Sequence, residues 1–370
     1  MGFGEILVAG QKVDVCNGDS WQRIRHRDDV SDDFLADPAS IGAFKSGGGK
    51  GGDLMAFSKC GQYIIKELNK GDHEALLSVT ESYVQRVLSG KSLLVTLYLH
   101  YLELGSGRFF MVMRNLLRHP GPYIGLYDLK GCADDKTLER HGRKIKVVNK
   151  RVWHVHMWCG DCAWSPDRVV YHAGKVAARE LSITVTDKQR NAIMERLRSD
   201  TAWLAQQNLM DYSLLLAMRK MSREEFDRDP TATWARRGGP SELRQPLLHV
   251  GEGDEAMLVY IGIIDFLQKW TTGKQIAMCL KVLERNKATI PPHPYAERFF
   301  DHFSRNIQGG AQPLDALAQD AAASRPSEKM MNFYSCVSFE DEALKLGVET
   351  PKASRSSTQW WSCFSGICGR

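Results

Sequence analysis

The chain has 370 residues, which is enough for one large domain or two smaller ones with an ample core. Hydrophobic residues make up 43% and charged residues 25% of it, as is ordinary for a soluble globular protein. The net charge of +5 is modest, so it indicates one basic face rather than a generally cationic protein.

Membrane-spanning and secreted proteins are disfavoured. The best apolar run, Ser92 to Leu104, is interrupted by His100 and Glu103 and is too short to span a bilayer. The first residues carry no signal-peptide pattern. Nine cysteines, an odd number, then favour reduced thiols, and we expect a cytoplasmic protein.

In chain order, the first marked feature is a glycine-rich stretch, Lys45 to Gly52. Glycine leaves backbone amides uncovered, so such a stretch can approach phosphates closely, although a flexible linker is the alternative. It is not a Walker A loop, because neither Ser nor Thr follows Gly49-Lys50. It is also a poor Rossmann turn, because a strand follows where a helix is required.

Two strands are expected next, Leu54–Phe57 and Gln62–Leu68. In the second strand Lys66 shares a face with Ile64 and Leu68, and a lysine in an apolar row is costly to bury unless it meets an anion. A glycine-rich hairpin followed by an inward lysine is how kinases hold phosphates. The alternative is a lysine at an edge, or one that extends to solvent.

A helix is expected over residues 71–88, and either Glu74 or Glu81 on it is a candidate partner of Lys66. Two strand-like runs follow, and the second, at residues 108–117, would leave the small sheet. A segment of that kind can offer backbone groups and Met or Leu side chains to an adenine ring. The alternative is a buried strand without a ligand.

Residues 136–151 hold seven Lys or Arg against the single Glu139. This bias indicates either a solvated basic loop or a face that meets an anionic membrane. Four possible zinc ligands follow: His154, His156, Cys159 and Cys162. Because only one Cys-x-x-Cys pair is present, a tryptophan-rich insertion is favoured over a zinc site.

Asp211 lies where a helix is expected to end and a strand to begin. Thr186 and Gln189 form a capping-box pattern before a helical apolar face, and Tyr212–Met218 is an apolar run that suits a buried strand. A carboxylate in that place is either a turn residue or a general base held rigidly at a cleft.

Asp265 ends a second buried strand, and two such carboxylates opposite a glycine-rich loop suit magnesium and a general base. Residues 222–255 are expected to form a long loop before that strand, and residues 270–294 a mobile loop after it. A final helix is expected from Tyr295.

The order of these motifs resembles the phosphatidylinositol phosphate kinase family over about residues 19–308. The segments that carry the resemblance are Ile-Ile-Lys66, Asp128-Leu-Lys130-Gly, Met210-Asp211-Tyr-Ser-Leu-Leu, Gly262-Ile-Ile-Asp265 and Tyr295-Ala-Glu-Arg298-Phe. The resemblance implies an α+β, two-lobed lipid-kinase fold with antiparallel sheets and an interlobe ATP cleft. The expected division is an N-terminal segment, an N-lobe, a C-lobe and a disordered tail: residues 1–18, 19–117, 118–308 and 309–370.

The resemblance also implies roles for individual residues. Asp211 would be the catalytic aspartate, Asp128 and Lys130 would line the site of transfer, and Asp265 would hold Mg²⁺. Lys66 would bind the α- and β-phosphates of ATP. The remaining nucleotide contacts would come from the glycine-rich loop and the interlobe strand: Ser46, Gly47, Gly49, Gly52, Met113, Asn115 and Leu116.

Several positions depart from the family pattern. Cys132 stands where the family usually has Ser, and the basic residues that normally follow are reduced to Lys136 and Arg140. The family's Lys-Asp-x-Asp-Phe segment is not recognisable near Lys175, where an insertion occupies residues 153–173. These departures concern substrate contacts more than ATP binding.

Three functions are compared. The first is an active lipid kinase, peripheral on the cytosolic face of an anionic membrane, that phosphorylates a phosphatidylinositol monophosphate. The second is a catalytically weak phosphoinositide-binding scaffold, against which the intact Lys66, Asp211 and Asp265 argue. The third is a nucleic-acid-binding protein, which is disfavoured because no recognised nucleic-acid module is present.

Substrate choice is expected to depend on a loop that contains Lys274, Ala277 and Lys281. Family members that act on phosphatidylinositol 4-phosphate usually carry Glu at the position of Ala277, whereas those that act on the 5-phosphate usually carry Ala. The contexts around Asp211 and Asp265 resemble the 5-kinases more, so 5-kinase activity is expected and 4-kinase activity is the alternative. In the tail, Cys363 and Cys368 are candidate acylation sites.

Overall fold

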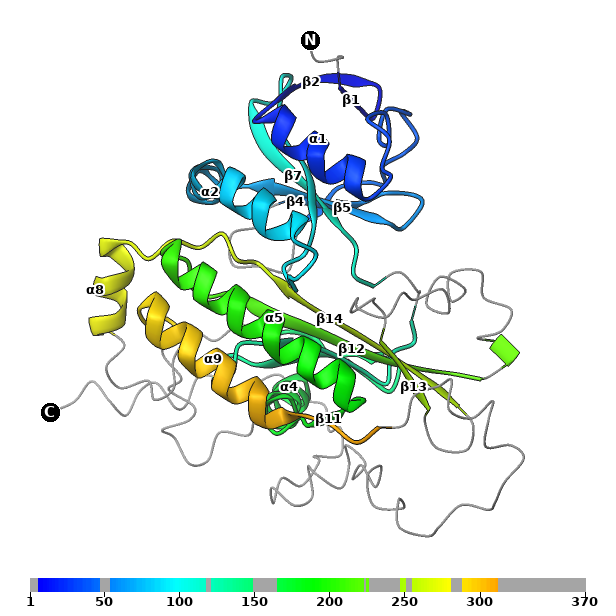
Figure 1. Ribbon diagram of the computed structural model, residues 1–370, viewed down its shortest axis with the longest axis vertical. Coiled ribbons are helices and arrows are strands. Elements are labelled where there is room, and N and C mark those ends of the chain that lie inside the picture. The colour runs from blue at the N-terminus through cyan, green and yellow to red at the C-terminus, as the bar shows by residue number, and fades with distance from the viewer. Residues whose placement is uncertain are drawn as a thin grey trace, which may run out of the picture. The chain divides into compact units, whose positions relative to one another are not determined.

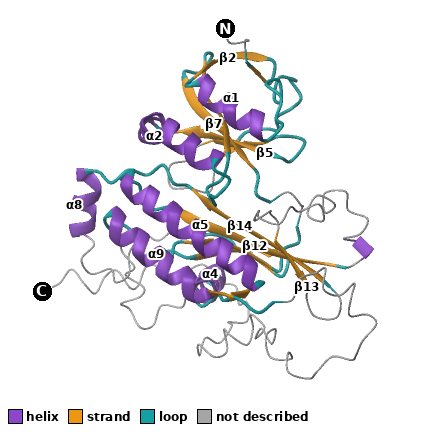
Figure 2. Ribbon diagram, viewed as in Figure 1, coloured by secondary structure: helices purple, strands orange, loops and turns teal. Residues whose placement is uncertain are grey.

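The computed structural model describes residues 6–46, 54–117, 121–148, 165–222, 224–225, 247–250, 255–280 and 288–311. The chain divides into two compact units, residues 1–147 with 174–325 and residues 148–173 with 326–370. The sheets described below belong to the first unit, which mixes helices with antiparallel sheets as the sequence predicted (Figure 2).

The first sheet is antiparallel and has seven strands in the order β1-β2-β6-β7-β5-β4-β3. The central position of β7 places the run at residues 108–114 inside this sheet. Its strands are β1 (Leu7–Val8), β2 (Gln11–Val15), β3 (Lys45–Ser46), β4 (Leu54–Phe57), β5 (Tyr63–Leu68), β6 (Leu97–Glu103) and β7 (Arg108–Arg114).

The second sheet is also antiparallel, with six strands in the order β10-β9-β8-β12-β14-β13. Its strands are β8 (Gly125–Leu129), β9 (Lys136–Arg140), β10 (Arg143–Lys144), β12 (Ser213–Met221), β13 (Leu247–Val250) and β14 (Ala256–Ile264). A third sheet pairs two short parallel strands, β11 (Ile183–Thr184) and β15 (Ile307–Gln308).

The longer helices begin where the sequence carries capping residues. Thr186 and Gln189 form the expected capping box, and the side chain of Asn69 accepts a hydrogen bond from the backbone of Asp72. Helices α5 and α9 run side by side (Figure 1). The helices are α1 (Gly18–Arg27), α2 (Lys70–Leu88), α4 (Pro166–Arg179), α5 (Asp187–Gln206), α8 (Thr272–Leu280) and α9 (Pro292–Asn306). In the described part of the chain, none is long and apolar enough to cross a membrane.

Three expected loops are wrong in part. The basic stretch begins as the β9–β10 hairpin, in which Glu139 and Arg140 are buried. The segment 222–255 contains β13, and the segment 270–294 contains α8 and the start of α9. The three loop predictions rest on charge and on Gly or Pro content. The short segments that form strands or helices within these loops carry a weaker local signal.

The two large sheets meet at the residues that precede β6. Val95 donates its backbone N–H to the carbonyl of Ile263 at 2.9 Å, and Ile263 donates to the carbonyl of Leu93 at 2.7 Å. The same segment is held by Tyr83 on α2, whose hydroxyl donates to the carbonyl of Val95 at 2.7 Å. Tyr83 also stacks on Phe266, just beyond β14, so α2 contacts both the segment before β6 and the segment after β14.

A buried carboxylate fixes this junction from the other side. Asp200 of α5 is fully buried, and its Oδ1 accepts hydrogen bonds from Nε of Arg86 at 2.8 Å and from the hydroxyl of Ser92 at 2.9 Å. Its Oδ2 accepts the backbone N–H of Leu93 at 2.6 Å. Burial raises the pKa of Asp200, and the hydrogen bonds with the Arg86 charge oppose that shift.

We expect Asp200→Ala to lower the free energy of unfolding by about 3–5 kcal/mol, because the largely buried charge of Arg86 loses its ion-pair partner. Glu195→Ala on the same helix is the matched control. Glu195 forms only an exposed ion pair with Lys91 at 3.4 Å, so its loss should cost less than about 1 kcal/mol. Denaturant unfolding of both variants measures the difference, and equal effects would contradict the structural role of Asp200.

Candidate active site

The register of the second sheet brings the candidate residues to one end of three neighbouring strands. Leu129 at the end of β8 pairs with Leu214, and Ser213 at the start of β12 pairs with Ile264 at the end of β14. Lys130, Asp211 and Asp265 are the residues that lie just beyond these ends, so they leave the sheet together.

Lys130 and Asp211 form a direct ion pair. Nζ of Lys130 donates to Oδ1 of Asp211 at 2.6 Å and to the backbone carbonyl of the same residue at 2.8 Å. The lysine side chain is 14% exposed and the aspartate side chain 34%. The carboxylate is therefore accessible to a substrate while the lysine fixes its orientation.

Lys66 of β5 reaches Asp265, with Nζ donating to Oδ1 at 2.7 Å. Burial alone would raise the pKa of Asp265, but the charge and hydrogen bond of Lys66, then the charges of Lys130 and Lys136, hold that pKa below its ordinary value. Asp265 is thus ionised at neutral pH, as a cation ligand must be.

Asp128 completes the group. Its Oδ2 accepts a hydrogen bond from Nζ of Lys136 at 3.3 Å, whereas its Oδ1 is buried and has no hydrogen-bond partner among the described residues. A buried carboxyl oxygen in that state is a ready acceptor. We call these six residues the Lys–Asp cluster: Lys66, Lys130, Lys136, Asp128, Asp211 and Asp265.

Both accessible carboxylates of the cluster lie on left-handed backbone. Asp211 has φ of 65° and Asp265 has φ of 55°. Aspartate tolerates this region better than most residues with a side chain, but the conformation still needs support from its surroundings. Two aspartates held in this state at one site are typical of a functional constraint.

The support comes from pairing between the two loops that carry these aspartates. Met210 donates its backbone N–H to the carbonyl of Gln268, and Trp270 donates to the carbonyl of Asn208, each at 2.9 Å. Tyr295 of α9 donates its hydroxyl to the carbonyl of Tyr212 at 2.5 Å. The two loops therefore hold each other.

A residue that the sequence did not reveal positions Lys130. Asp135 is 1% exposed, and its Oδ1 accepts the backbone N–H groups of Lys130 at 2.5 Å and Cys132 at 3.3 Å. Burial raises the pKa of the Asp135 carboxyl to about 6, although these backbone hydrogen bonds favour its charged form. Only the closure of the turn at residues 130–135 makes this contact apparent.

The expected partner of Lys66 is corrected. The acidic group that binds it is Asp265, whereas Glu81 pairs with Arg23 at 2.9 Å and Glu74 with Lys70 at 3.9 Å. Both glutamates lie on α2, as expected.

The residues proposed to contact adenine lie at the end of β7 and just beyond it. Asn115 is buried, and its side-chain amide donates to the carbonyl of Gly61 at 2.8 Å, so it has a structural role. Met113 is half-buried, and Leu116 packs over Gly262, where an added Cβ would come within 2.5 Å of it.

Other expected residues are placed only in part. Ser46 ends β3, and Lys274 and Ala277 lie on α8. The remainder fall outside the described residues: Gly47, Gly49, Gly52, Lys281, His154, His156, Cys159, Cys162, Cys363 and Cys368. In the described ranges, no group of three or more His, Cys, Asp or Glu side chains forms a metal site.

Comparison with known proteins shows the family of this chain. Residues 41–306 match the sequence model of a class of lipid kinases, described as Phosphatidylinositol-4-phosphate 5-Kinase. Because the match covers most of the chain, the protein belongs to this family, and the resemblance drawn from its motifs is confirmed.

The relatives fall into two groups by name. A phosphatidylinositol 4-phosphate 5-kinase of Plasmodium falciparum is 24% identical over 70% of this chain and 15% of its own length. The corresponding 5-kinase of Schizosaccharomyces pombe is 22% identical over 70% of this chain and 41% of its own length. A phosphatidylinositol 5-phosphate 4-kinase type-2 gamma of Danio rerio is 22% identical over 77% of this chain and 74% of its own length. This chain thus spans well under half of the two 5-kinases.

Asp135 generates a pH-dependent prediction. Between the usual pKa of 3.8 and the raised pKa of about 6, the Asp135 carboxyl is protonated in the folded protein and ionised in the unfolded chain. The folded protein therefore loses stability relative to the unfolded chain as the pH rises through that window. Between pH 4 and 7 the wild type should lose up to about 3 kcal/mol of stability relative to Asp135→Asn. Denaturant unfolding at several pH values measures this difference. A stability difference that does not change with pH would contradict the raised pKa of Asp135.

Proposed function

We propose that this protein transfers the γ-phosphoryl group of ATP to the inositol ring of a phosphatidylinositol monophosphate. The observation that carries the proposal is the Lys–Asp cluster, in which Lys66 of the first sheet contacts Asp265, just beyond the end of β14 of the second. Phosphoryl transfer needs positioning and charge neutralisation more than covalent chemistry, and these residue types supply both.

The nucleotide is proposed to lie between two lobes, residues 19–117 and 118–308. Lys66 would hold the α- and β-phosphates, and the glycine-rich stretch from Ser46 to Gly52 would cover them. The adenine would lie near Met113 and Leu116. The resting ion pair between Lys66 and Asp265 would be replaced when the phosphates enter.

A magnesium ion fits the residues present. Asp265 offers an ionised carboxylate that is 49% exposed, and Asp128 offers a buried oxygen without a hydrogen-bond partner among the described residues. Magnesium in kinases needs only one or two carboxylates, since phosphates and water complete its octahedron. When bound, the ion would neutralise charge on the β- and γ-phosphates.

Asp211 is proposed as the general base. Its carboxylate would accept the proton of the attacking ring hydroxyl, while Lys130 holds the carboxylate in place and adds positive charge where the phosphoryl group moves. The membrane-facing loop of the proposal contains Lys274, Ala277 and Lys281, and would bring the lipid from an anionic surface.

We favour phosphatidylinositol 4-phosphate as substrate, with phosphatidylinositol 5-phosphate as the alternative. The sequence around Asp211 and Asp265 supports the first, and the names of two relatives agree with it. Ala277 and the similarity to a 5-phosphate 4-kinase support the second.

Asp211→Asn should lower lipid kinase turnover by about 10²–10⁴-fold, because it removes the proposed general base. Asp265→Asn should also lower turnover, because it removes the proposed magnesium ligand. Both variants should keep the fold, because Asn also tolerates left-handed backbone. Turnover is measured with labelled ATP, magnesium and vesicles that contain phosphatidylinositol 4-phosphate. Asp301→Asn, at an exposed position on α9, is the matched control and should be nearly neutral. Turnover near the wild-type level in either variant would refute the role assigned to the substituted residue. A wild type without kinase activity would favour a binding scaffold.

Ala277→Glu should shift the preference towards phosphatidylinositol 4-phosphate by roughly tenfold, because a carboxylate can orient nearby basic residues towards one ring phosphate. The readout is the ratio of kcat/KM for the 4-phosphate and 5-phosphate lipids. Gln275→Glu adds the same charge elsewhere on α8 and should leave the ratio unchanged. If the wild type phosphorylates only the 5-phosphate lipid, the favoured substrate is wrong.

A further inference from the structure

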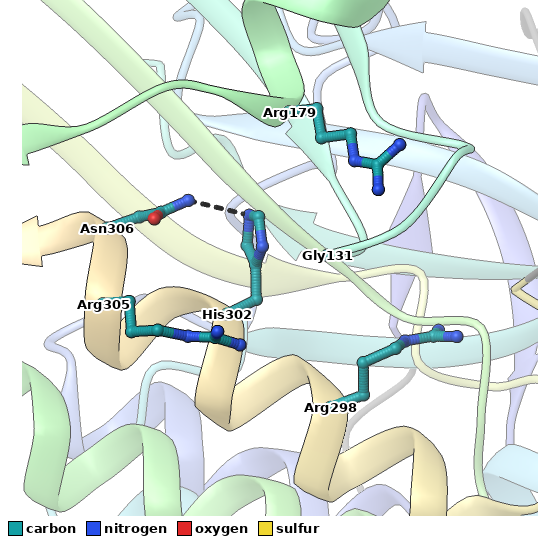
Figure 3. Close-up of a pocket in the computed structure, with 6 residues that line it drawn as sticks. All are labelled: Gly131, Arg179, Arg298, His302, Arg305 and Asn306. Atoms are coloured by element: carbon teal, nitrogen blue, oxygen red, sulfur yellow. Dashed lines mark hydrogen bonds between the residues drawn. The ribbon is translucent and has the colours of Figure 1, made fainter. Parts of the chain in front are cut away.

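A second charged site lies beside the turn that carries Lys130. Helix α9 presents Arg298, His302, Arg305 and Asn306 at helical spacing, so these side chains share one face. Arg179, the last residue of α4, and the turn at Gly131 close the other sides (Figure 3). Together they line a cavity of about 400 Å³, which we call the α9 basic pocket.

Two arginines of this pocket, Arg179 and Arg305, are available for a ligand. Neither Arg179 nor Arg305 forms an ion pair with a described residue, and Nε of Arg305 donates to the backbone carbonyl of Asp301 at 3.0 Å. Arg298 lies with its guanidinium carbon 5.0 Å from the ring centroid of Tyr295, which orients it by a cation–π contact. None of the described residues that line the pocket carries a carboxylate.

His302 lines the pocket together with its three arginines. Its Nε2 lies 3.0 Å from the side-chain amide of Asn306, a contact drawn in Figure 3. The pKa of His302 is lowered, first by burial and then by the charges of Arg305, Arg179 and Arg298. The imidazole is thus surrounded by cations, and an anion placed there would relieve their mutual repulsion.

Gly131 allows the backbone to approach the pocket closely. It has φ of 66°, and a Cβ added to it would lie 3.0 Å from Cβ of His302. The neighbouring Lys130 points its amine to Asp211, so one turn contributes a side chain to the Lys–Asp cluster and backbone to the pocket. The two sites are therefore adjacent but use different residues.

We propose that the α9 basic pocket is a binding site for a phosphate-bearing anion. Arginine presents donors in a planar fork that matches phosphate oxygens, and the two guanidinium groups of Arg179 and Arg305 can neutralise a phosphate monoester. The cavity volume suits a phosphorylated sugar or inositol ring better than a bare ion. The proposal concerns binding without nucleotide, so it stands whether or not phosphoryl transfer occurs. The source of the phosphate is a lipid headgroup or a soluble phosphate ester.

The test uses the full chain and two exposed arginines, so that substitutions do not disturb the core. Arg179→Gln and Arg305→Gln should each weaken binding of soluble inositol 1,4,5-trisphosphate by roughly tenfold, and the double variant should weaken it further. Calorimetry without ATP or magnesium gives the Kd, and thermal unfolding checks the fold. Arg143→Gln, an exposed arginine on β10, should leave the Kd unchanged.

A second arm distinguishes the sources. Vesicles of phosphatidylcholine with a small fraction of phosphatidylinositol 4-phosphate are sedimented with each variant, again without nucleotide. Loss of both soluble and vesicle binding in the double variant supports a lipid headgroup, and loss of soluble binding alone supports a free phosphate ester. Unchanged Kd values in the double variant, or no measurable binding of the trisphosphate by the wild type, overturn the proposal. Neither result requires turnover, so failure here is distinct from failure of the kinase assignment.

Discussion

Two backbone hydrogen bonds between residues 93–95 and Ile263 join the antiparallel sheets, and the site depends on them. Lys66 belongs to one sheet and Asp265 follows the last residue of β14 in the other, so the junction helps to bring the two residues to their 2.7 Å contact. Asp200 stabilises it by accepting the backbone N–H of Leu93. A fully buried carboxylate outside the Lys–Asp cluster thus helps to hold the junction between the sheets that supply Lys66 and precede Asp265.

Features with a local signal were predictable from the sequence. The capping box at Thr186 and Gln189 predicted the start of α5, and apolar runs predicted β12 and β14, so Asp211 and Asp265 were assigned to the ends of buried strands. Both positions are confirmed because each depends on a few adjacent residues. The expected helix over residues 71–88 is confirmed for the same reason, with Asn69 as its cap.

Features that depend on distant parts of the chain were missed. Lys66 was expected to bind a glutamate of α2, but sheet register places Asp265 in reach, and register between separate strands cannot be read from one segment. Asp135 resembles an ordinary turn residue until the turn closes over it. The helical spacing of Arg298, His302 and Arg305 on α9 is visible in the sequence. The pocket itself could not be predicted, because Arg179, which also lines it, belongs to another helix.

The Lys–Asp cluster contains three lysines and three aspartates, so the formal charges cancel within it. A neutral set of charges produces only a weak field beyond about one Debye length, roughly 8 Å at physiological ionic strength. An incoming polyanion would therefore be guided little from a distance by the charges of this cluster itself. Recognition at the cluster would begin only at contact, when phosphates exchange with carboxylates one pair at a time.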